Sequence, residues 1–272
     1  MKQCVVIIPL YKDSPSKIEI ASFRQGLSIL KRYDISIITH TGVNLTEYLK
    51  IAKEVGKNFN IQYFDKNYFT SVYGYNRLCL STSLYERFIN YEYMLIYQTD
   101  AWVFKDELEY WCNKGYDYIG APWFKTKDWK NFSHKFDSVG NGGFSLRRVK
   151  HCLEILTLNN EKKFLTLQGL ISLSNSIIDY LKVPIKYWGI CNNIKYFVNK
   201  KKHYIYEDML FSKYAKFSTF NCKIAECHDG MRFSFEANPS YLFKLNQNQL
   251  PFGCHAFEKF EYDIFWKKYI SI

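Results

Sequence analysis

The chain has 272 residues, of which 47% are hydrophobic and 19% are aromatic. This composition is typical of a globular protein and excludes an intrinsically disordered chain. The net charge of +11, from 37 basic and 26 acidic residues, favours anionic partners such as phosphorylated substrates or lipid headgroups. No apolar run reaches the roughly 18 residues that cross a bilayer, and no signal-peptide core precedes Pro9. We therefore expect one continuous cytoplasmic domain over residues 1–272.

The first hundred residues alternate between apolar runs and segments with helical periodicity. Apolar runs predict strands at residues 4–9, 35–39, 61–64 and 93–98, and the helical spacing of apolar side chains predicts helices at 16–32, 45–55 and 73–90. This order is typical of a mostly parallel, Rossmann-like sheet that is flanked by helices and joined by right-handed crossovers. Ligands bind such sheets at the carboxyl ends of the strands, where Tyr11, Lys12, Asp65 and Asp100 fall.

The second half is less regular. We expect a helix at 106–113, a short strand at 116–119, helical stretches from 148 to about 181, and a helix at 207–214. The tail from residue 222 is predicted to be rich in loops. The basic cluster of Arg147, Arg148 and Lys150 adds to the positive charge but matches no recognition helix or RNA-binding motif, so we expect no nucleic-acid partner.

The clearest candidate site follows the strand at 93–98. The apolar run brings Gln98, Thr99 and Asp100 into a turn. A carboxylate at the mouth of a sheet can bind a divalent cation, and the cation can bind a diphosphate. A turn-forming aspartate without any function is the alternative interpretation of this segment.

Three further segments carry candidate chemistry. Residues 140–145 place three glycines around Asn141, which permits close approach of the backbone to a ligand, or simply a hairpin turn. The adjacent acids Glu207 and Asp208 either stabilise a helix N-terminus or supply a general base. His255, in the loop after Pro251, is a candidate metal ligand or a structural histidine. The glycines lack the GxGxxG spacing of a dinucleotide fingerprint, and the absence of a GxxxxGK(S/T) loop from the chain argues against a P-loop kinase.

Seven blocks occur in order along nearly the whole chain, from about residue 4 to residue 258: VVIIPLYK, YEYMLIYQTDAWVF, YDYIGAPW, VGNGGFSLR, YEDMLF, RFSFE and PFGCHAF. Together they resemble the bacterial glycosyltransferases of the DUF5672 family. The resemblance implies an α/β, GT-A-like fold with a loop-rich C-terminal acceptor region. Residues 1–105 would bind a nucleotide sugar, and residues 106–272 would bind the acceptor and supply catalysis.

The resemblance also implies a donor site and a cofactor. The donor-binding residues would be Pro9, Tyr11, Lys12, Asn76, Arg77, Gln98, Thr99, Asp100, Gly142 and Gly143. Asp100 matches the last acid of the DxD motif, and with His255 it would bind Mn²⁺ or Mg²⁺. Gln98 replaces the first acid of that motif, and an amide is a weaker ligand than a carboxylate, so the need for a metal stays open.

The acceptor side follows from the same resemblance. Asp208 matches the acid that serves as catalytic base in inverting enzymes, and Trp123 and Glu207 would contact the acceptor. The implied donor is a UDP-, GDP- or dTDP-sugar, and the acceptor is a glycan or a lipid-linked glycan in surface polysaccharide biosynthesis. A lipid-linked acceptor and the positive charge are consistent with peripheral association with the inner face of the membrane.

Two other functions remain open at this stage. A sugar-nucleotide pyrophosphorylase would be expected to have a glycine-rich basic loop directly after the first strand, where this chain has residues 10–14, LYKDS. A non-catalytic glycan-binding protein would explain the many aromatic side chains, but it would not need Asp100 and Asp208 together.

Overall fold

The computed structural model describes residues 1–125, 134–158, 206–215 and 221–272. Its centre is a six-stranded sheet in the order β3-β2-β1-β4-β9-β6. The strands are β1 (Lys2–Pro9), β2 (Asp34–Thr39), β3 (Asn60–Tyr63), β4 (Tyr91–Tyr97), β6 (Tyr118–Ile119) and β9 (Phe144–Arg148). Strands β1 to β4 are parallel, and β9 runs antiparallel to its neighbours β4 and β6. The mostly parallel central sheet predicted from the sequence is thus confirmed.

The central strands are apolar along their length because helices cover both faces of the sheet. Val6 and Ile8 of β1 belong to one core cluster and Val5 and Ile7 to another, as alternation along a strand requires. The first cluster includes side chains of α1 (Lys17–Ile29), α2 (Thr46–Val55) and α5 (Leu108–Asn113). The second includes side chains of α3 (Val72–Cys79), α4 (Thr82–Glu86) and α6 (Val149–Leu158).

Two helices differ from the sequence prediction. The single helix expected at 73–90 is the pair α3 and α4, because the Ser81 hydroxyl donates to Leu78 O and the Tyr85 hydroxyl donates to Cys79 O. The helix expected at 207–214 is α11 (Glu207–Met209) followed by a π-helical segment, η3 (Leu210–Tyr214). Beyond α6, the helical stretch expected up to residue 181 lies outside the described residues.

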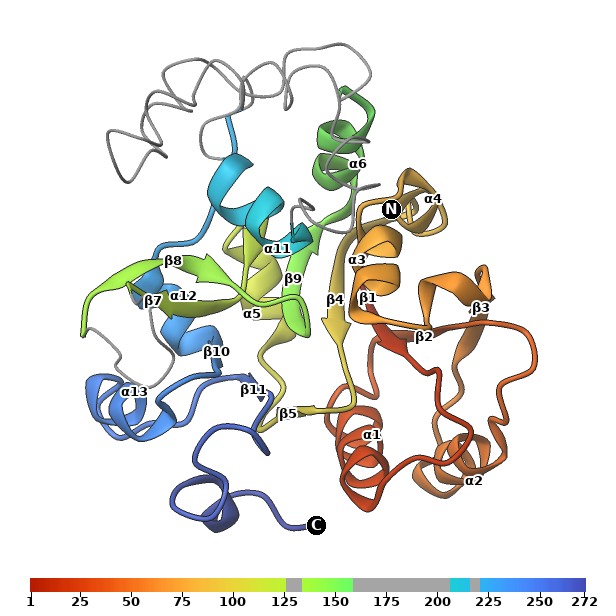
Figure 1. Cartoon of the computed structure of the whole chain (residues 1–272), viewed down its shortest axis with the longest axis horizontal. Helices are drawn as coiled ribbons and strands as arrows, with labels where there is room; N and C mark the ends of the chain where they lie inside the picture. The colour runs from red at the N-terminus through yellow and green to blue at the C-terminus, as the bar shows by residue number, and fades with distance from the viewer. Residues whose placement is uncertain (126–133, 159–205, 216–220) are drawn as a thin grey trace.

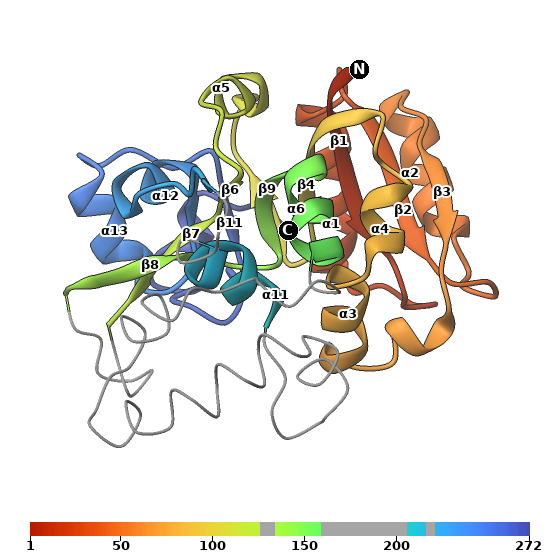
Figure 2. The same ribbon diagram turned by 90° about the horizontal axis from the view of Figure 1, so that it is seen from above.

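The C-terminal half packs beside the end of the central sheet formed by β9 and the edge strand β6 (Figures 1 and 2). It contains the hairpin β7 (Ala121–Phe124) and β8 (Phe136–Gly140), and a three-stranded sheet in the order β10-β11-β5. Its remaining elements are β5 (Ala101–Val103), α12 (Cys227–Phe233), β10 (Ser234–Phe235), α13 (Pro239–Leu245), β11 (Gly253–His255) and η5 (Trp266–Lys268). The short 3₁₀ turn η1 (Lys66–Tyr68) belongs to the N-terminal half. A third core cluster, with Trp102 and Trp266, lies under this sheet.

The connection between the two sheets determines where the candidate site residues lie. Strand β4 ends at Tyr97, and β5 begins only four residues later, after the turn of Gln98, Thr99 and Asp100. Strand β5 pairs antiparallel with β11 in a register that sets Ala101 opposite His255. Two segments far apart in the chain therefore meet at the carboxyl end of β4. Within the described parts of the chain, no helix is long and apolar enough to cross a membrane.

Candidate functional site

Asp100 and His255 face each other where β5 meets β11. The imidazole Nε2 of His255 lies 3.2 Å from Asp100 Oδ1, and its Nδ1 lies 3.0 Å from Glu236 Oε1. Although burial raises the pKa of Asp100, the neighbouring imidazole and the ammonium of Lys259 hold it at about 2. Burial lowers the pKa of His255, but the two carboxylates raise it to about 10. Without a bound cation, the imidazole is therefore held as a protonated link between two acids.

This arrangement fits a divalent cation. His255 Nε2 is buried without a well-aligned hydrogen bond, and a carboxylate oxygen and an imidazole nitrogen at this separation can bind the same ion. Glu236 on the opposite ring nitrogen would orient the imidazole, as carboxylates commonly do behind metal-binding histidines. No group of three or more His, Cys, Asp and Glu side chains in the described residues is arranged to hold a metal. Phosphate oxygens and water would have to complete the coordination sphere.

A cavity of about 390 Å³ opens beside this cluster, at the carboxyl ends of β1 and β4. Its lining comprises Pro9, Tyr11, Lys12, Ser16, Glu19, Gln98, Thr99, Asp100, Glu258 and Lys259. Six of these were predicted as donor-binding residues. The cavity also contains two ammonium groups: Lys12 Nζ lies 2.8 Å from Glu19 Oε1, and Lys259 Nζ lies 3.8 Å from Asp100 Oδ2. The structure brings these groups together at one end of the sheet.

The remaining predicted donor residues occupy other positions. Asn76 and Arg77, in α3, do not line this cavity. Asn76 is buried, and its Oδ1 accepts a 2.7 Å hydrogen bond from the backbone N–H of Glu207. The guanidinium of Arg77 lies over the ring of Tyr68, 5.8 Å from its centre. Asn76 therefore connects α3 to the start of α11, a contact that the sequence alone did not indicate.

The glycine turn lies between the predicted metal ligand and the acidic pair. Asn141 has a φ of 87°, and its Oδ1 accepts hydrogen bonds from Gly143 N at 2.8 Å and from the next backbone N–H. A Cβ on Gly143 would lie 2.0 Å from His255 Nε2, and a Cβ on Gly142 would lie 2.2 Å from Glu207 Oε1. No larger residue fits either position without displacing a candidate site residue. The turn thus holds His255 and Glu207 against opposite sides of one backbone segment.

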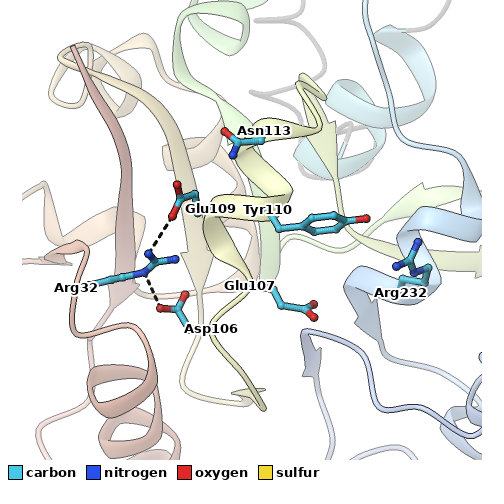
Figure 3. A pocket seen from close by; sticks show the side chains of 7 residues that line it. All are labelled: Arg32, Asp106, Glu107, Glu109, Tyr110, Asn113 and Arg232. Carbon is cyan, nitrogen blue, oxygen red and sulfur yellow. Dashed lines mark hydrogen bonds and ion pairs between the residues drawn. The ribbon is translucent and has the colours of Figure 1, made fainter.

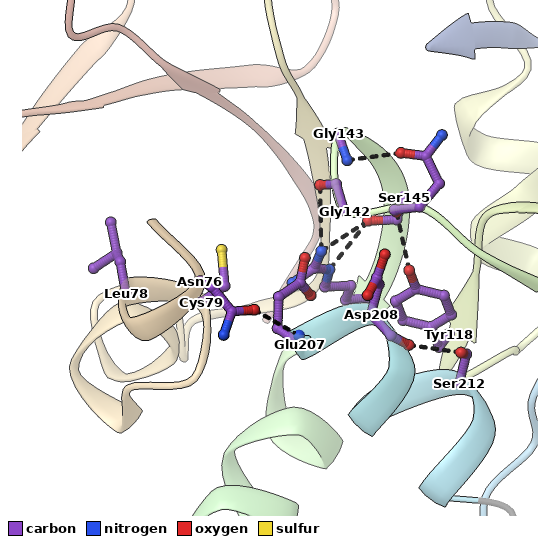
Figure 4. Close-up of polar contacts among 12 residues, drawn as sticks. Asn76, Leu78, Cys79, Tyr118, Gly142, Gly143, Ser145, Glu207, Asp208 and Ser212 are labelled. Carbon is purple, nitrogen blue, oxygen red and sulfur yellow. Dashed lines mark hydrogen bonds and ion pairs between the residues drawn. The ribbon is translucent and has the colours of Figure 1, made fainter. Parts of the chain in front are cut away.

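The acids at the start of α11 differ in environment (Figure 4). Glu207 is buried and forms an ion pair with Arg147, at 2.8 Å between Oε2 and Nη1. Burial and the negative charge of Glu207 raise the pKa of Asp208 to about 7. A carboxyl group with a pKa near neutrality can take up a proton under physiological conditions, which is the property of a general base. The adjacent acids therefore differ: Glu207 is ion-paired, whereas Asp208 has a pKa of about 7.

Arg147 changes the interpretation of the basic cluster. The sequence suggested that Arg147, Arg148 and Lys150 add to a positive surface, but the side chain of Arg147 is 0% exposed. Arg148 forms an ion pair with Asp117 at 3.4 Å. Arg147 therefore adds no charge to the surface, because a charge pattern alone does not reveal which charges have buried partners.

Trp123 lies in the β7–β8 hairpin, one strand away from the glycine turn. Its side chain is partly buried and packs over Gly140, and its backbone pairs with Ser138 of β8. The indole is therefore close to the start of the turn, although it does not line the donor cavity.

A second cavity, of about 520 Å³, lies beside α5 (Figure 3). It is lined by Arg32, Asp106, Glu107, Glu109, Tyr110, Asn113 and Arg232. Arg32 pairs with Asp106 at 2.7 Å and with Glu109 at 2.9 Å. None of the sequence-predicted site residues lines this cavity, and Arg32 is already paired with two of its acids, so we assign it no ligand.

The chain is similar to one protein family and to several solved structures. Residues 58–255 match the family model described as "Protein of unknown function (DUF5672)". Among solved structures, the galactosyltransferase LgtC in complex with donor and acceptor sugar analogs has a TM-score of 0.52 at 12% identity, covering 92% of this chain and 86% of LgtC. An active-site mutant of LgtC gives 0.51 at 14% identity, with the same coverage. No curated protein matches the sequence. The likeness to LgtC shows a GT-A fold.

Proposed function

This chain belongs to the DUF5672 family and has the GT-A glycosyltransferase fold, and on that basis we propose that it is a glycosyltransferase that uses a nucleoside-diphosphate sugar. The observation that carries the proposal is the convergence of two groups of residues on one glycine turn. On one side, His255 faces Asp100 at the donor cavity; on the other, Glu207 precedes an Asp208 with a pKa near 7. The first group suits a diphosphate and its cation, and the second suits an acceptor hydroxyl.

The donor diphosphate would occupy the cavity beside Asp100. Tyr11 lines the same cavity and is 46% exposed, so it is available to contact the nucleoside. The ammonium groups of Lys12 and Lys259 would offset the charge of the diphosphate. Asp100 and His255 would hold Mn²⁺ or Mg²⁺ when it is bound, and the cation would stabilise the negative charge on the departing nucleoside diphosphate.

We assign the role of base to Asp208, in an inverting transfer. Its ionised carboxylate takes the proton of an acceptor hydroxyl while that oxygen forms a bond to the anomeric carbon. The bond from the anomeric carbon to the diphosphate oxygen breaks on the opposite face, and its electron pair leaves with the nucleoside diphosphate. In this proposal the acceptor lies beside Trp123, on the side of the glycine turn where Glu207 is paired with Arg147. A glycan or lipid-linked acceptor, and a role in surface polysaccharide assembly at a membrane, are part of this proposal.

A binding screen separates this function from the two alternatives. Calorimetry with UDP, GDP, CMP and dTDP, with and without Mn²⁺, should show one preferred nucleoside diphosphate. Binding should be weakened in Asp100→Ala and unchanged in Asp208→Asn, because only Asp100 lines the donor cavity. A glycan-binding protein would bind none of these nucleotides, and a pyrophosphorylase would convert a sugar 1-phosphate and a nucleoside triphosphate into a nucleotide sugar. Either result would reject the proposal.

A further inference from the structure

Arg147 is a fully buried cation in β9, the strand next to the edge of the central sheet. Its guanidinium forms an ion pair with Glu207 and donates to the hydroxyls of Ser145, at 3.0 and 3.1 Å, and Tyr85, at 3.3 Å. A further hydrogen bond of 3.4 Å reaches Gly142 O. Burial of an arginine is expensive unless its donors are satisfied, and these contacts pair or satisfy each nitrogen of the guanidinium.

The ion pair joins the two segments that frame the proposed acceptor side. Arg147 belongs to β9 and bonds to the glycine turn at Gly142, while Glu207 opens α11. Asn76, in α3, accepts a hydrogen bond from the backbone N–H of Glu207 through its side-chain oxygen. Glu207 is thus held through both its side chain and its backbone, and Asp208 is the next residue in the chain (Figure 4).

Several groups face the carboxyl of Asp208. Glu207 and Glu236 are negative and Arg147 is positive; the phenol of Tyr118, in β6, is also close enough to interact electrostatically. The backbone N–H of Met209 donates to Asp208 Oδ1 at 2.8 Å. Removal of the charge on Glu207 would leave Arg147 as the dominant nearby charge, and a nearby cation favours the ionised carboxylate.

We propose that the buried Arg147–Glu207 ion pair is the positioning element of the base Asp208: it fixes the first turn of α11 against the glycine turn and sets the charge around the Asp208 carboxyl. The proposal rests on the proposed function, in which Asp208 is the base. In the proposed reaction, neither Arg147 nor Glu207 touches the reacting atoms. The assignment also replaces the acceptor contact that the sequence suggested for Glu207 with a role in orienting its neighbour.

The variant Glu207→Gln keeps the shape of the side chain and removes its charge. In protein labelled with ¹³C-aspartate, the carboxyl resonance of Asp208, assigned by its absence in Asp208→Asn, reports its titration midpoint without any turnover. We expect Glu207→Gln to lower this midpoint by about 1 pH unit or more. The acid limb of the kcat profile should move by the same amount. An unchanged or raised midpoint would overturn the proposal.

A matched control is Glu109→Gln, which removes a carboxylate paired with an arginine, Arg32, at a similar 2.9 Å distance (Figure 3). It should leave the Asp208 midpoint unchanged; an equal shift would show that the effect is not local. Wild-type protein that lacks transferase activity would count against the proposed function alone, since the titration does not depend on turnover.

A double variant tests the positioning role separately from the charge. Replacement of both partners by apolar residues, Arg147→Met with Glu207→Leu, avoids leaving one charge buried alone, and such replacements often preserve stability. We expect a folded protein with nucleoside diphosphate affinity within twofold of wild type and a kcat at least tenfold lower. A folded double variant with wild-type kcat would overturn the proposal.

Discussion

The raised pKa of Asp208 has a consequence for stability that can be measured without knowledge of the substrate. Burial and the charge of Glu207 raise this pKa from 3.8 to about 7. A carboxyl group whose pKa is higher in the folded than in the unfolded state contributes to the stability of the folded protein at low pH. This stabilisation is lost as the pH rises through the folded-state pKa of about 7. This difference between the two states corresponds to about 4 kcal/mol, of which about 3 kcal/mol is lost between pH 5 and pH 8.

The variant Asp208→Asn removes this effect. Asparagine is neutral at every pH and can still accept the hydrogen bond from Met209 N. In urea unfolding, Asp208→Asn should therefore be more stable than wild type at pH 8, and the advantage should shrink by about 3 kcal/mol at pH 5. Asp208→Asn should at the same time lose activity, as expected where a catalytic group is kept at the expense of stability.

Asp229→Asn is a control with the opposite sign. Although burial raises the pKa of Asp229, the hydroxyl of Tyr116, 2.6 Å away, and the ammonium of Lys114 keep it below its usual value. Asp229→Asn should be less stable than wild type at pH 8, and this deficit should shrink as the pH falls through the lowered pKa. Equal stability differences for Asp208→Asn at pH 5 and pH 8 would refute the reasoning, as would a loss of stability at pH 8.

Three further predictions concern the donor side. Gly143→Ala should lower turnover by about 100-fold, because the added methyl lies 2.0 Å from His255 Nε2 and must displace the imidazole; wild-type kinetics would show that the turn tolerates it. Lys259→Ala should weaken binding of the preferred nucleoside diphosphate about tenfold in calorimetry, whereas Lys267→Ala, on the exposed surface, should not change it. Glu236→Gln should weaken Mn²⁺ binding by about 10- to 100-fold, as measured by titration with the metal, because the imidazole loses its orienting carboxylate.

Much of the fold could be predicted from the sequence because the central strands are buried on both faces. Their uninterrupted apolar runs, such as residues 4–9, stand out from the helical segments between them. The break between α3 and α4 could not be predicted in this way. It depends on the hydroxyls of Ser81 and Tyr85, which reach backbone carbonyls of the preceding turn, and apolar spacing carries no information about such bonds.

Part of the candidate site could also be predicted from the sequence. Asp100 and His255 belong to recognisable blocks, and the sheet brings them together through the pairing of β5 with β11. Glu236 is the acid of the RFSFE block, and its position in that block is the feature of the sequence from which a role could have been predicted. Arg147 gave no such signal, because its partner Glu207 reaches it only in the folded chain, and Lys259 could not be distinguished from the many other lysines.

The most direct test of the central claim is release of nucleoside diphosphate from a panel of UDP-, GDP- and dTDP-sugars at pH 8, with water or added glycans as acceptor. We predict turnover with one nucleotide class by the wild type. Asp208→Asn should bind the same nucleoside diphosphate with unchanged affinity and keep no more than a few per cent of the rate. Near-normal turnover by Asp208→Asn would contradict the assignment of the base, and no release from any donor would contradict the transferase itself.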